Sequence, residues 1–250
     1  MMPGTPHSTT RAAKPQPQLH LLLYTRCTGY KHTCIPAAVT AFQSLGHHTV
    51  VTEDPTVYFR SADALTENFD VVVLLHCIGD DIFTPTQLAS LRGFLNAGGG
   101  VVAVHGAAAA MTGDEWYGRM VGAHFDSHPD PEPGMVIVEE SSAGHEILAG
   151  LAGLSRKDGW VDEWYNFRRH PRDNANLKIL LRGDPKSFKG GKMGEDHPLS
   201  WCQEFEGGRV WFTALGHFDE AYEDEWFMGM VERGIVWAAA AKQAGIGGGR

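Results

Sequence analysis

Residues 98–110 have the sequence "GGGVVAVHGAAAA" and give the strongest indication of the fold. Three glycines lead into four apolar residues that predict a short buried strand, and the strand ends at His105. Only glycine and alanine follow up to residue 110, so the chain leaves open space over the turn. A strand needed only for a core has no reason to end on an imidazole. Because ligands of open α/β sheets bind beyond the carboxyl ends of the strands, we expect a site here.

The chain on the amino-terminal side of this stretch alternates apolar strands with helices. Thr84-Pro85-Thr86-Gln87 is a capping box with proline at the first helical position, and Gly98 can end that helix. A second helix is predicted over 35–46, with Pro36 in its first turn. The predicted strands are 19–25, 48–52, 70–77 and 101–105. Strands that alternate with helices in this way indicate a parallel sheet covered on both faces.

The second half of the chain predicts strands without helices between them. "EGG", residues 206–208, is a turn between two of these strands and predicts a hairpin. The strands are predicted at 134–140, 176–184, 197–205 and 209–217, and a closing helix at about 223–241. We therefore expect one α/β domain over 19–241, a three-layer sandwich whose mostly parallel sheet is extended by antiparallel strands. Residues 1–18 and 242–250 are expected to be flexible tails.

Composition excludes several classes of function. The net charge of −9 disfavours nucleic acid or an anionic membrane as a partner. No apolar run reaches the roughly 18–20 residues of a membrane span, and the first 18 residues lack the apolar core of a secretory signal. The four cysteines have no C-x-x-C spacing and are interpreted as reduced thiols, which favours a cytoplasmic location. Neither G-x-G-x-x-G nor Walker A, H-E-x-x-H or G-x-S-x-G is present, so no nucleotide cofactor is expected.

Histidines gather at one end of the predicted sheet. The chain has 13 histidines, and four strand ends carry one at or shortly beyond them, namely His32, His76, His105 and His217. Arg26 follows the first strand as well. A single strand-end histidine is most often structural, and His76, beside Cys77, stays nearer that interpretation. The other three favour function because they form a set.

Three further segments carry candidate site residues. "GAHFDSHP" (122–129) contains His124 and His128 and is either a substrate-facing loop, a metal loop or a turn shaped by Asp126 and Pro129. In "DEWYNF" (162–167), Asp162 and Glu163 are neighbours, so only one of them can face a given cleft if the segment is a strand. Aromatic residues beside these polar groups are typical of a sugar site, and rim positions are an equal alternative. They are Tyr165 and, in "HPLSW", Trp201 with His197.

These motifs together resemble the ThuA-like family, named for trehalose utilisation. The resemblance rests on "TGYKH", "EDP", "DVVVLL", "GGGVVAVHGA", "GAHFDSHP", "DEWYNF", "HPLSW" and "GRVWFTALGHF", in the family's order over about residues 19–241. It implies a flavodoxin-like fold similar to that of class I glutamine amidotransferases. Those enzymes carry a cysteine nucleophile on the elbow after a central strand, where this chain has Val104-His105-Gly106-Ala107. The scaffold is therefore expected to be retained and glutamine hydrolysis lost.

The resemblance implies a role in carbohydrate metabolism. Our leading hypothesis is an enzyme that acts on a disaccharide or 3-keto-sugar by acid–base chemistry, of hydrolase, lyase or isomerase type. His105 and His217 would transfer protons, with Glu163 as their carboxylate partner. The remaining candidates would bind the substrate, with Arg26 and His32 on its hydroxyls and the aromatic rings as an apolar wall; this set is Arg26, His32, His124, His128, Tyr165, His197 and Trp201.

Two alternatives remain open from the same residues. His32, His105, His217 and Glu163 could hold a divalent metal such as zinc in a metal-dependent hydrolase, because catalytic zinc uses three His or carboxylate ligands and one open position. The chain could also be a non-catalytic module that binds a sugar or a partner. If the protein is an enzyme, its expected ligand is a small carbohydrate. The sequence is also compatible with a homo-oligomer.

Overall fold

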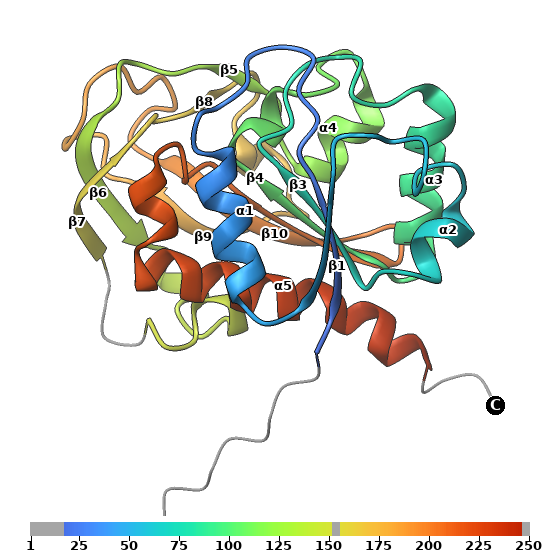
Figure 1. The fold of residues 1–250 in the computed structure, drawn as a ribbon. Helices are drawn as coiled ribbons and strands as arrows, with labels where there is room; N and C mark the ends of the chain where they lie inside the picture. The colour runs from blue at the N-terminus through green and yellow to red at the C-terminus, as the bar shows by residue number, and fades with distance from the viewer. Residues whose placement is uncertain (1–17, 152–155, 247–250) are drawn as a thin grey trace, which may run out of the picture.

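A nine-stranded mixed sheet crosses the molecule, with helices on both of its faces (Figure 1). The computed structural model describes residues 18–151 and 156–246. The strand order is β2-β1-β3-β4-β11-β10-β9-β6-β7. The five strands from one edge to the middle are parallel: β1 (His20–Tyr24), β2 (His48–Thr52), β3 (Val71–Leu75), β4 (Gly100–Val104) and β11 (Gly208–Thr213). The predicted α/β class with a parallel first half is confirmed.

The other half of the sheet is antiparallel. Its strands are β6 (Glu132–Val138), β7 (Arg156–Asp162), β9 (Lys178–Gly183) and β10 (His197–Phe205). Strand β10 forms the predicted hairpin with β11, and Glu206 (φ 48°) and Gly207 (φ 96°) make its turn. β7 was not predicted, and neither was the small separate sheet of β5 (Phe125–Ser127) and β8 (Asn166–Phe167).

Helices α1 (Ile35–Ser44) and α5 (Glu225–Ile246) lie together on one face of the sheet (Figure 1). α5 packs directly on the two central strands, because a Cβ on Gly100 would lie 2.7 Å from the Ala238 backbone and one on Gly234 would lie 2.2 Å from the Trp211 ring. The opposite face carries the helices α2 (Ala62–Thr66), α3 (Pro85–Asn96) and α4 (Glu115–Val121). The Thr84–Gln87 capping box that starts α3 is present as predicted.

Two sharp turns follow the central strands β3 and β4. His76 (φ 55°) and His105 (φ 49°) both adopt the left-handed conformation that non-glycine residues seldom take. His105 then begins a 3-10 turn, η1 (His105–Ala109), where the sequence predicted the last residue of a strand. Gly106 is required there, because a Cβ would lie 2.8 Å from Cγ1 of Ile78. Such strained turns cluster at functional sites, where the surrounding packing holds them.

The ends of the domain differ in part from the prediction. Helix α5 continues to Ile246, beyond the end expected at 241. Lys242, which the sequence placed in the tail, donates through Nζ to the carbonyl oxygens of Thr66 and Phe69, each at 2.7 Å. These two hydrogen bonds hold the last turns of α5 against the end of α2 and the segment after it. The spacing of apolar residues in the sequence did not indicate this longer helix. Of the predicted tails 1–18 and 242–250, residues 1–17 and 247–250 lie outside the described residues.

Candidate active site

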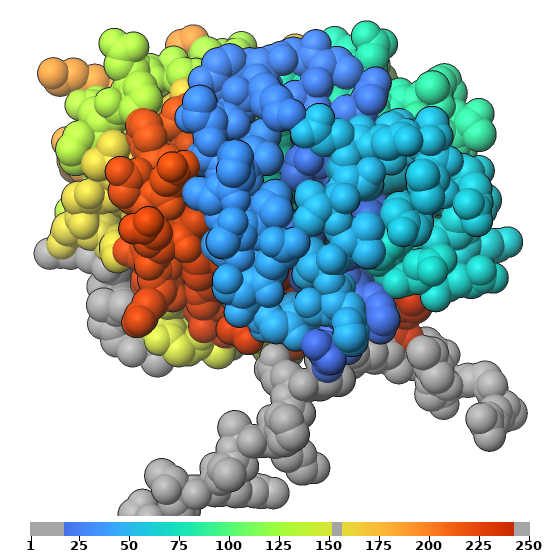
Figure 2. All heavy atoms as spheres, viewed as in Figure 1, coloured from blue at the N-terminus to red at the C-terminus, as the bar shows by residue number. Residues whose placement is uncertain are grey.

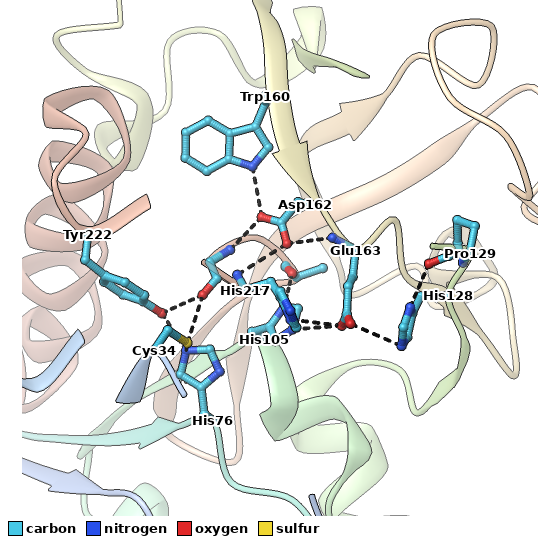
Figure 3. A network of polar contacts seen from close by, with 12 residues as sticks. Cys34, His76, His105, His128, Pro129, Trp160, Asp162, Glu163, His217 and Tyr222 are labelled. Atoms are coloured by element: carbon cyan, nitrogen blue, oxygen red, sulfur yellow. Dashed lines mark hydrogen bonds and ion pairs between the residues drawn. The ribbon is translucent and has the colours of Figure 1, made fainter. Parts of the chain in front are cut away.

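Four side chains from separate elements converge at the carboxyl end of the parallel strands. His32 follows β1, His105 follows β4 and His217 follows β11, whereas Glu163 comes directly after β7. One ligand atom of each lies within 4.8 Å of those of the other three, and we call these residues the His/Glu cluster. Figure 3 shows the side chains of His105, Glu163 and His217 directed toward one another. They are the same four residues that the sequence offered as a possible metal set.

The His105 ring is fixed through its Nδ1 nitrogen. Nδ1 lies 2.5 Å from the carbonyl oxygen of Ala214, to which it donates its proton. Nε2 faces Oε2 of Glu163 and Nδ1 of His217, both at 3.3 Å. In a neutral ring, Nε2 then directs a lone pair at a carboxylate oxygen, which is unfavourable unless a proton or a cation lies between them. A carbonyl partner on the outer nitrogen is the arrangement that orients histidine ligands of metals.

The neighbouring carboxylates Asp162 and Glu163 have different roles, as expected for residues that face opposite sides. Glu163 places Oε2 3.2 Å from Nδ1 of His217 and so completes a triangle with His105. Asp162 is fully buried and accepts hydrogen bonds from the backbone N–H groups of Gly216 (2.8 Å) and His217 (3.3 Å). It also accepts one from Nε1 of Trp160 at 2.9 Å. Asp162 therefore holds the loop that presents His217.

Burial and mutual contacts set the charges of the cluster. Burial, together with the imidazoles of His105 and His217, lowers the pKa of His32 to about 3, so His32 is neutral at neutral pH. Burial opposes the charged form of Glu163, but its contacts with the imidazoles of His105 and His217 more than offset this and hold the pKa of Glu163 well below its usual value. Burial likewise lowers the pKa of His217, and contact with Glu163 outweighs this and raises it. An ionised carboxylate thus lies among three imidazoles.

The spacing of the cluster fits a small divalent cation. Ligands about 2.0–2.1 Å from a tetrahedral zinc ion lie about 3.3–3.4 Å from one another. The three contacts among His105 Nε2, His217 Nδ1 and Glu163 Oε2 measure 3.2–3.3 Å. His32 offers a fourth nitrogen within 4.8 Å, and its Nδ1 is buried without a hydrogen-bond partner. Three ligands with a fourth group nearby are typical of a catalytic site that keeps one position for substrate.

A chain of hydrogen bonds links His76 to the same loop (Figure 3). Nε2 of His76 lies 2.5 Å from the hydroxyl of Tyr222, which donates to the carbonyl oxygen of Gly216 at 3.0 Å. The Sγ atom of Cys34 lies 3.6 Å from the same Nε2 and 3.7 Å from the same carbonyl. His76 therefore supports the residue before His217 instead of adding a ligand, in line with its structural interpretation.

Two of the predicted binding residues border the cluster. The Tyr165 ring is buried and packs on the His105 ring at a centroid distance of 4.4 Å, which gives the cluster an apolar wall. His128 donates through Nδ1 to the carbonyl oxygen of Pro129 at 2.8 Å, and its Nε2 lies 3.3 Å from Oε1 of Glu163. The side chain of His128 is 35% exposed, so it stands between the cluster and solvent.

The four other predicted residues do not belong to the cluster. Trp201 is buried, donates to the carbonyl oxygen of Val121 at 2.7 Å and packs on Phe212, so it is a core residue and not a wall of the site. His197 is buried and donates to the carbonyl oxygen of Tyr165 at 3.0 Å.

His124 and Arg26 also contact groups outside the cluster. Nε2 of His124 lies 3.3 Å from the carbonyl oxygen of Asp114, at the start of α4. Nε of Arg26 is buried without a hydrogen-bond partner, and the Arg26 charge acts on Asp54 beyond β2, where it adds to the hydrogen bonds from Thr56 that lower the pKa of that carboxyl. The sequence placed all four near the correct end of the sheet but could not show which way each side chain points.

Sequence reasoning missed the supports of the cluster. Tyr222 and Cys34 have no motif around them, and they meet His76 only through the packing of η5 (Asp219–Tyr222) against α1. The one available signal was the closeness of Tyr222 to His217 in the chain. The role of Asp162 depends on three backbone N–H groups and an indole, which sequence does not reveal.

Comparison with known proteins identifies the family. The family model described as trehalose utilisation, ThuA, matches residues 20–238. The chain belongs to the ThuA family. The turn after β4 carries His105, and none of the four cysteines lies on that turn. The comparison with curated proteins finds no match.

Solved structures share the ThuA fold over almost the whole chain. A thuA-like protein from Bacteroides uniformis is 21% identical, with a TM-score of 0.74 over 92% of this chain and 95% of that one. Another from Parabacteroides merdae is 17% identical, with a TM-score of 0.71 over 90% and 91%. A cytoplasmic protein from Salmonella typhimurium is 13% identical, with a TM-score of 0.61 over 88% and 99%. In the described part of the chain, no helix is long and apolar enough to cross a membrane.

Proposed function

We propose that this ThuA protein is a metal-dependent cytoplasmic enzyme that acts on a disaccharide or 3-keto-sugar. The observation that carries the metal is the triangle of His105 Nε2, His217 Nδ1 and Glu163 Oε2, with sides of 3.2–3.3 Å. The family's link to trehalose utilisation supports a carbohydrate substrate. The Salmonella typhimurium protein is described as cytoplasmic, and we extend this location to the present chain as part of the proposal.

The residues of the cluster divide the work as follows. His105, His217 and Glu163 would hold the ion, and Ala214 and Asp162 fix the two histidines from behind. When bound, the ion would supply Lewis-acid polarisation of a carbonyl or hydroxyl oxygen of the sugar. His32 is neutral at neutral pH and buried beside the proposed ligands, so it would hold a substrate hydroxyl by a hydrogen bond. Tyr165 supplies an apolar surface and His128 a polar group at the entrance.

A metal-free acid–base enzyme is the second candidate. The same triangle can hold a proton instead of an ion, because Glu163 raises the pKa of His217 and shares a contact with His105. In that case His105 and His217 transfer protons directly, as the sequence led us to expect. The two candidates use the same residues, and metal content separates them.

Elemental analysis of purified protein tests the proposal. We expect about one transition metal ion per chain and its loss in Glu163→Gln, which keeps the shape of the side chain but removes the anionic ligand. Exposed His48→Ala is the matched control and should keep the ion. Turnover of disaccharides and their 3-keto forms should stop with chelator and return with added metal. Protein that is free of metal and active in chelator supports the second candidate, and protein that binds sugar without turnover supports a binding module.

A further inference from the structure

A cavity lies next to the His/Glu cluster, on the far side of Trp160. It has a volume of about 410 Å³ and opens between the outer strand β7 and the segment 218–224. Figure 2 shows these two parts of the chain as neighbours, with the orange-red segment that precedes α5 beside the yellow strand. Its size is within the range of cavities that bind small molecules. None of its lining residues belongs to the cluster.

The lining of the cavity combines aromatic rings with a few charged groups. Trp160 and Phe218 line it, with Val161, which is 45% exposed. Lys157 forms an ion pair of 2.6 Å with Asp224, and its Nζ lies 5.9 Å from the centre of the Trp160 ring. A pyranose ring has an apolar C–H face and a rim of hydroxyl groups. Aromatic faces with an amine and a carboxylate at their edge match both features.

Two contacts join this cavity to the cluster. The Phe218 ring packs on the His217 ring at a centroid distance of 4.5 Å. Nε1 of Trp160 donates to Asp162, which in turn accepts the backbone N–H of His217. Phe218 is half-buried, lines the cavity and packs on His217, so this one side chain contacts both the cavity and a member of the cluster.

We propose that this cavity is a subsite for the second ring of a disaccharide, whose first ring lies at the His/Glu cluster. The inference rests on the proposed function and adds to it, because it selects disaccharides over single sugars. Binding the second ring adds contact area beyond the reacting ring and orients the bond between the two rings across Phe218. The protein should therefore bind a disaccharide more tightly than the matching monosaccharide.

Calorimetric titration of the metal-loaded protein with trehalose and with glucose tests the subsite. We expect the wild type to bind trehalose at least about 10-fold more tightly than glucose, which corresponds to about 1.4 kcal/mol. Val161→Trp fills the cavity without touching the cluster, and it should abolish this preference while glucose binding stays unchanged. Val57→Trp is the matched control, because Val57 is similarly exposed at 46% and lies elsewhere. It should keep the preference.

Glu220→Ala is a second variant for the case in which Val161→Trp does not fold. Glu220 lines the cavity from its exposed side, and its removal should weaken trehalose binding about 3-fold and leave glucose binding alone. Equal binding of both sugars by the wild type, or a preference that survives Val161→Trp, overturns the subsite while the metal site stands. Absence of binding for both sugars overturns the subsite and the proposed carbohydrate function together.

Discussion

The turns after β3 and β4 place the same residue type in the same conformation and use it differently. His76 and His105 are both fully buried, both have a φ near 50°, and their rings lie 5.3 Å apart. Nε2 of His105 faces Glu163, whereas Nε2 of His76 faces the hydroxyl of Tyr222. A position at a strand end therefore brings a histidine close to the cluster. The partner of its Nε2 atom then decides whether the ring belongs to the cluster or supports it from outside.

Replacing His105 should have the largest effect. His105→Asn keeps a residue that tolerates positive φ but removes the nitrogen that faces Glu163 and His217. We expect loss of the bound metal and a fall in turnover of about 10²-fold or more. Metal content and single-substrate kinetics check this, with circular dichroism to show that the fold persists. Full turnover per folded molecule would remove His105 from the site.

Lowering the pH should destabilise the protein through a third buried histidine. Burial lowers the pKa of His197 to about 4, and its hydrogen bond to the carbonyl oxygen of Tyr165 only partly offsets this. His197 is protonated near pH 6.5 in the unfolded chain but only near pH 4 in the folded protein. The free energy of unfolding therefore falls as the pH drops from about 6.5 to about 4. The loss reaches a few kcal/mol. Denaturant unfolding of wild type and His197→Gln at pH 7 and 5 measures it, and the variant should show the smaller difference.

Replacing His76 in the same way as His105 tests the comparison most directly. His76→Asn also tolerates the positive φ, but it loses the contact with Tyr222 in a fully buried place. We expect a cost of about 1–3 kcal/mol in the free energy of unfolding. Turnover per folded molecule should change by less than about 10-fold. A loss of turnover as large as that of His105→Asn, with normal stability, would show that both turns act in the chemistry.

The smallest expected effect comes from the hydroxyl of Tyr222, which contacts His76. Tyr222→Phe removes the hydrogen bond to the Gly216 carbonyl and leaves the ring in place. We expect a loss of about 1 kcal/mol in unfolding free energy and weaker metal binding, since Gly216 precedes His217, one of the proposed ligands. Chemical denaturation measures the free energy of unfolding, and competition with a metal chelator measures the metal affinity. Unchanged metal affinity would confine Tyr222 to a structural role.

The parallel half of the fold was predicted more fully than the antiparallel half. Continuous apolar runs, the capping box at Thr84 and glycines at helix ends are local signals, and they located β1, β3, β4 and α3. β7 was missed because "RKDGWVD" carries charged and glycine residues on an edge strand, where burial selects few positions. The end of α5 was misplaced because its last turns lack a stop signal before the final glycines.

The members of the His/Glu cluster were predicted, but the orientation of their side chains was not. Strand order at the carboxyl ends was enough to bring His32, His105 and His217 together, and the pairing of Asp162 with Glu163 indicated that one would face inward. Which nitrogen of His105 is free depends on the Ala214 carbonyl, more than one hundred residues away in the chain. Trp201 and His197 are residue types found in sugar sites and lie near the same end of the sheet. Their side chains are nevertheless buried in the core, where each donates a hydrogen bond to a backbone carbonyl.

The order of the strands has a consequence for how the protein is made. β11, the last strand of the chain, occupies the middle of the sheet between β4 and β10. A nascent chain on the ribosome can pair β1, β2, β3 and β4 early, but the slot beside β4 stays open until residue 213 has emerged. His217 follows that strand, 112 residues after His105. The His/Glu cluster therefore assembles only after β11 has been made, and a chain truncated before β11 exposes an unpaired central strand edge that favours aggregation.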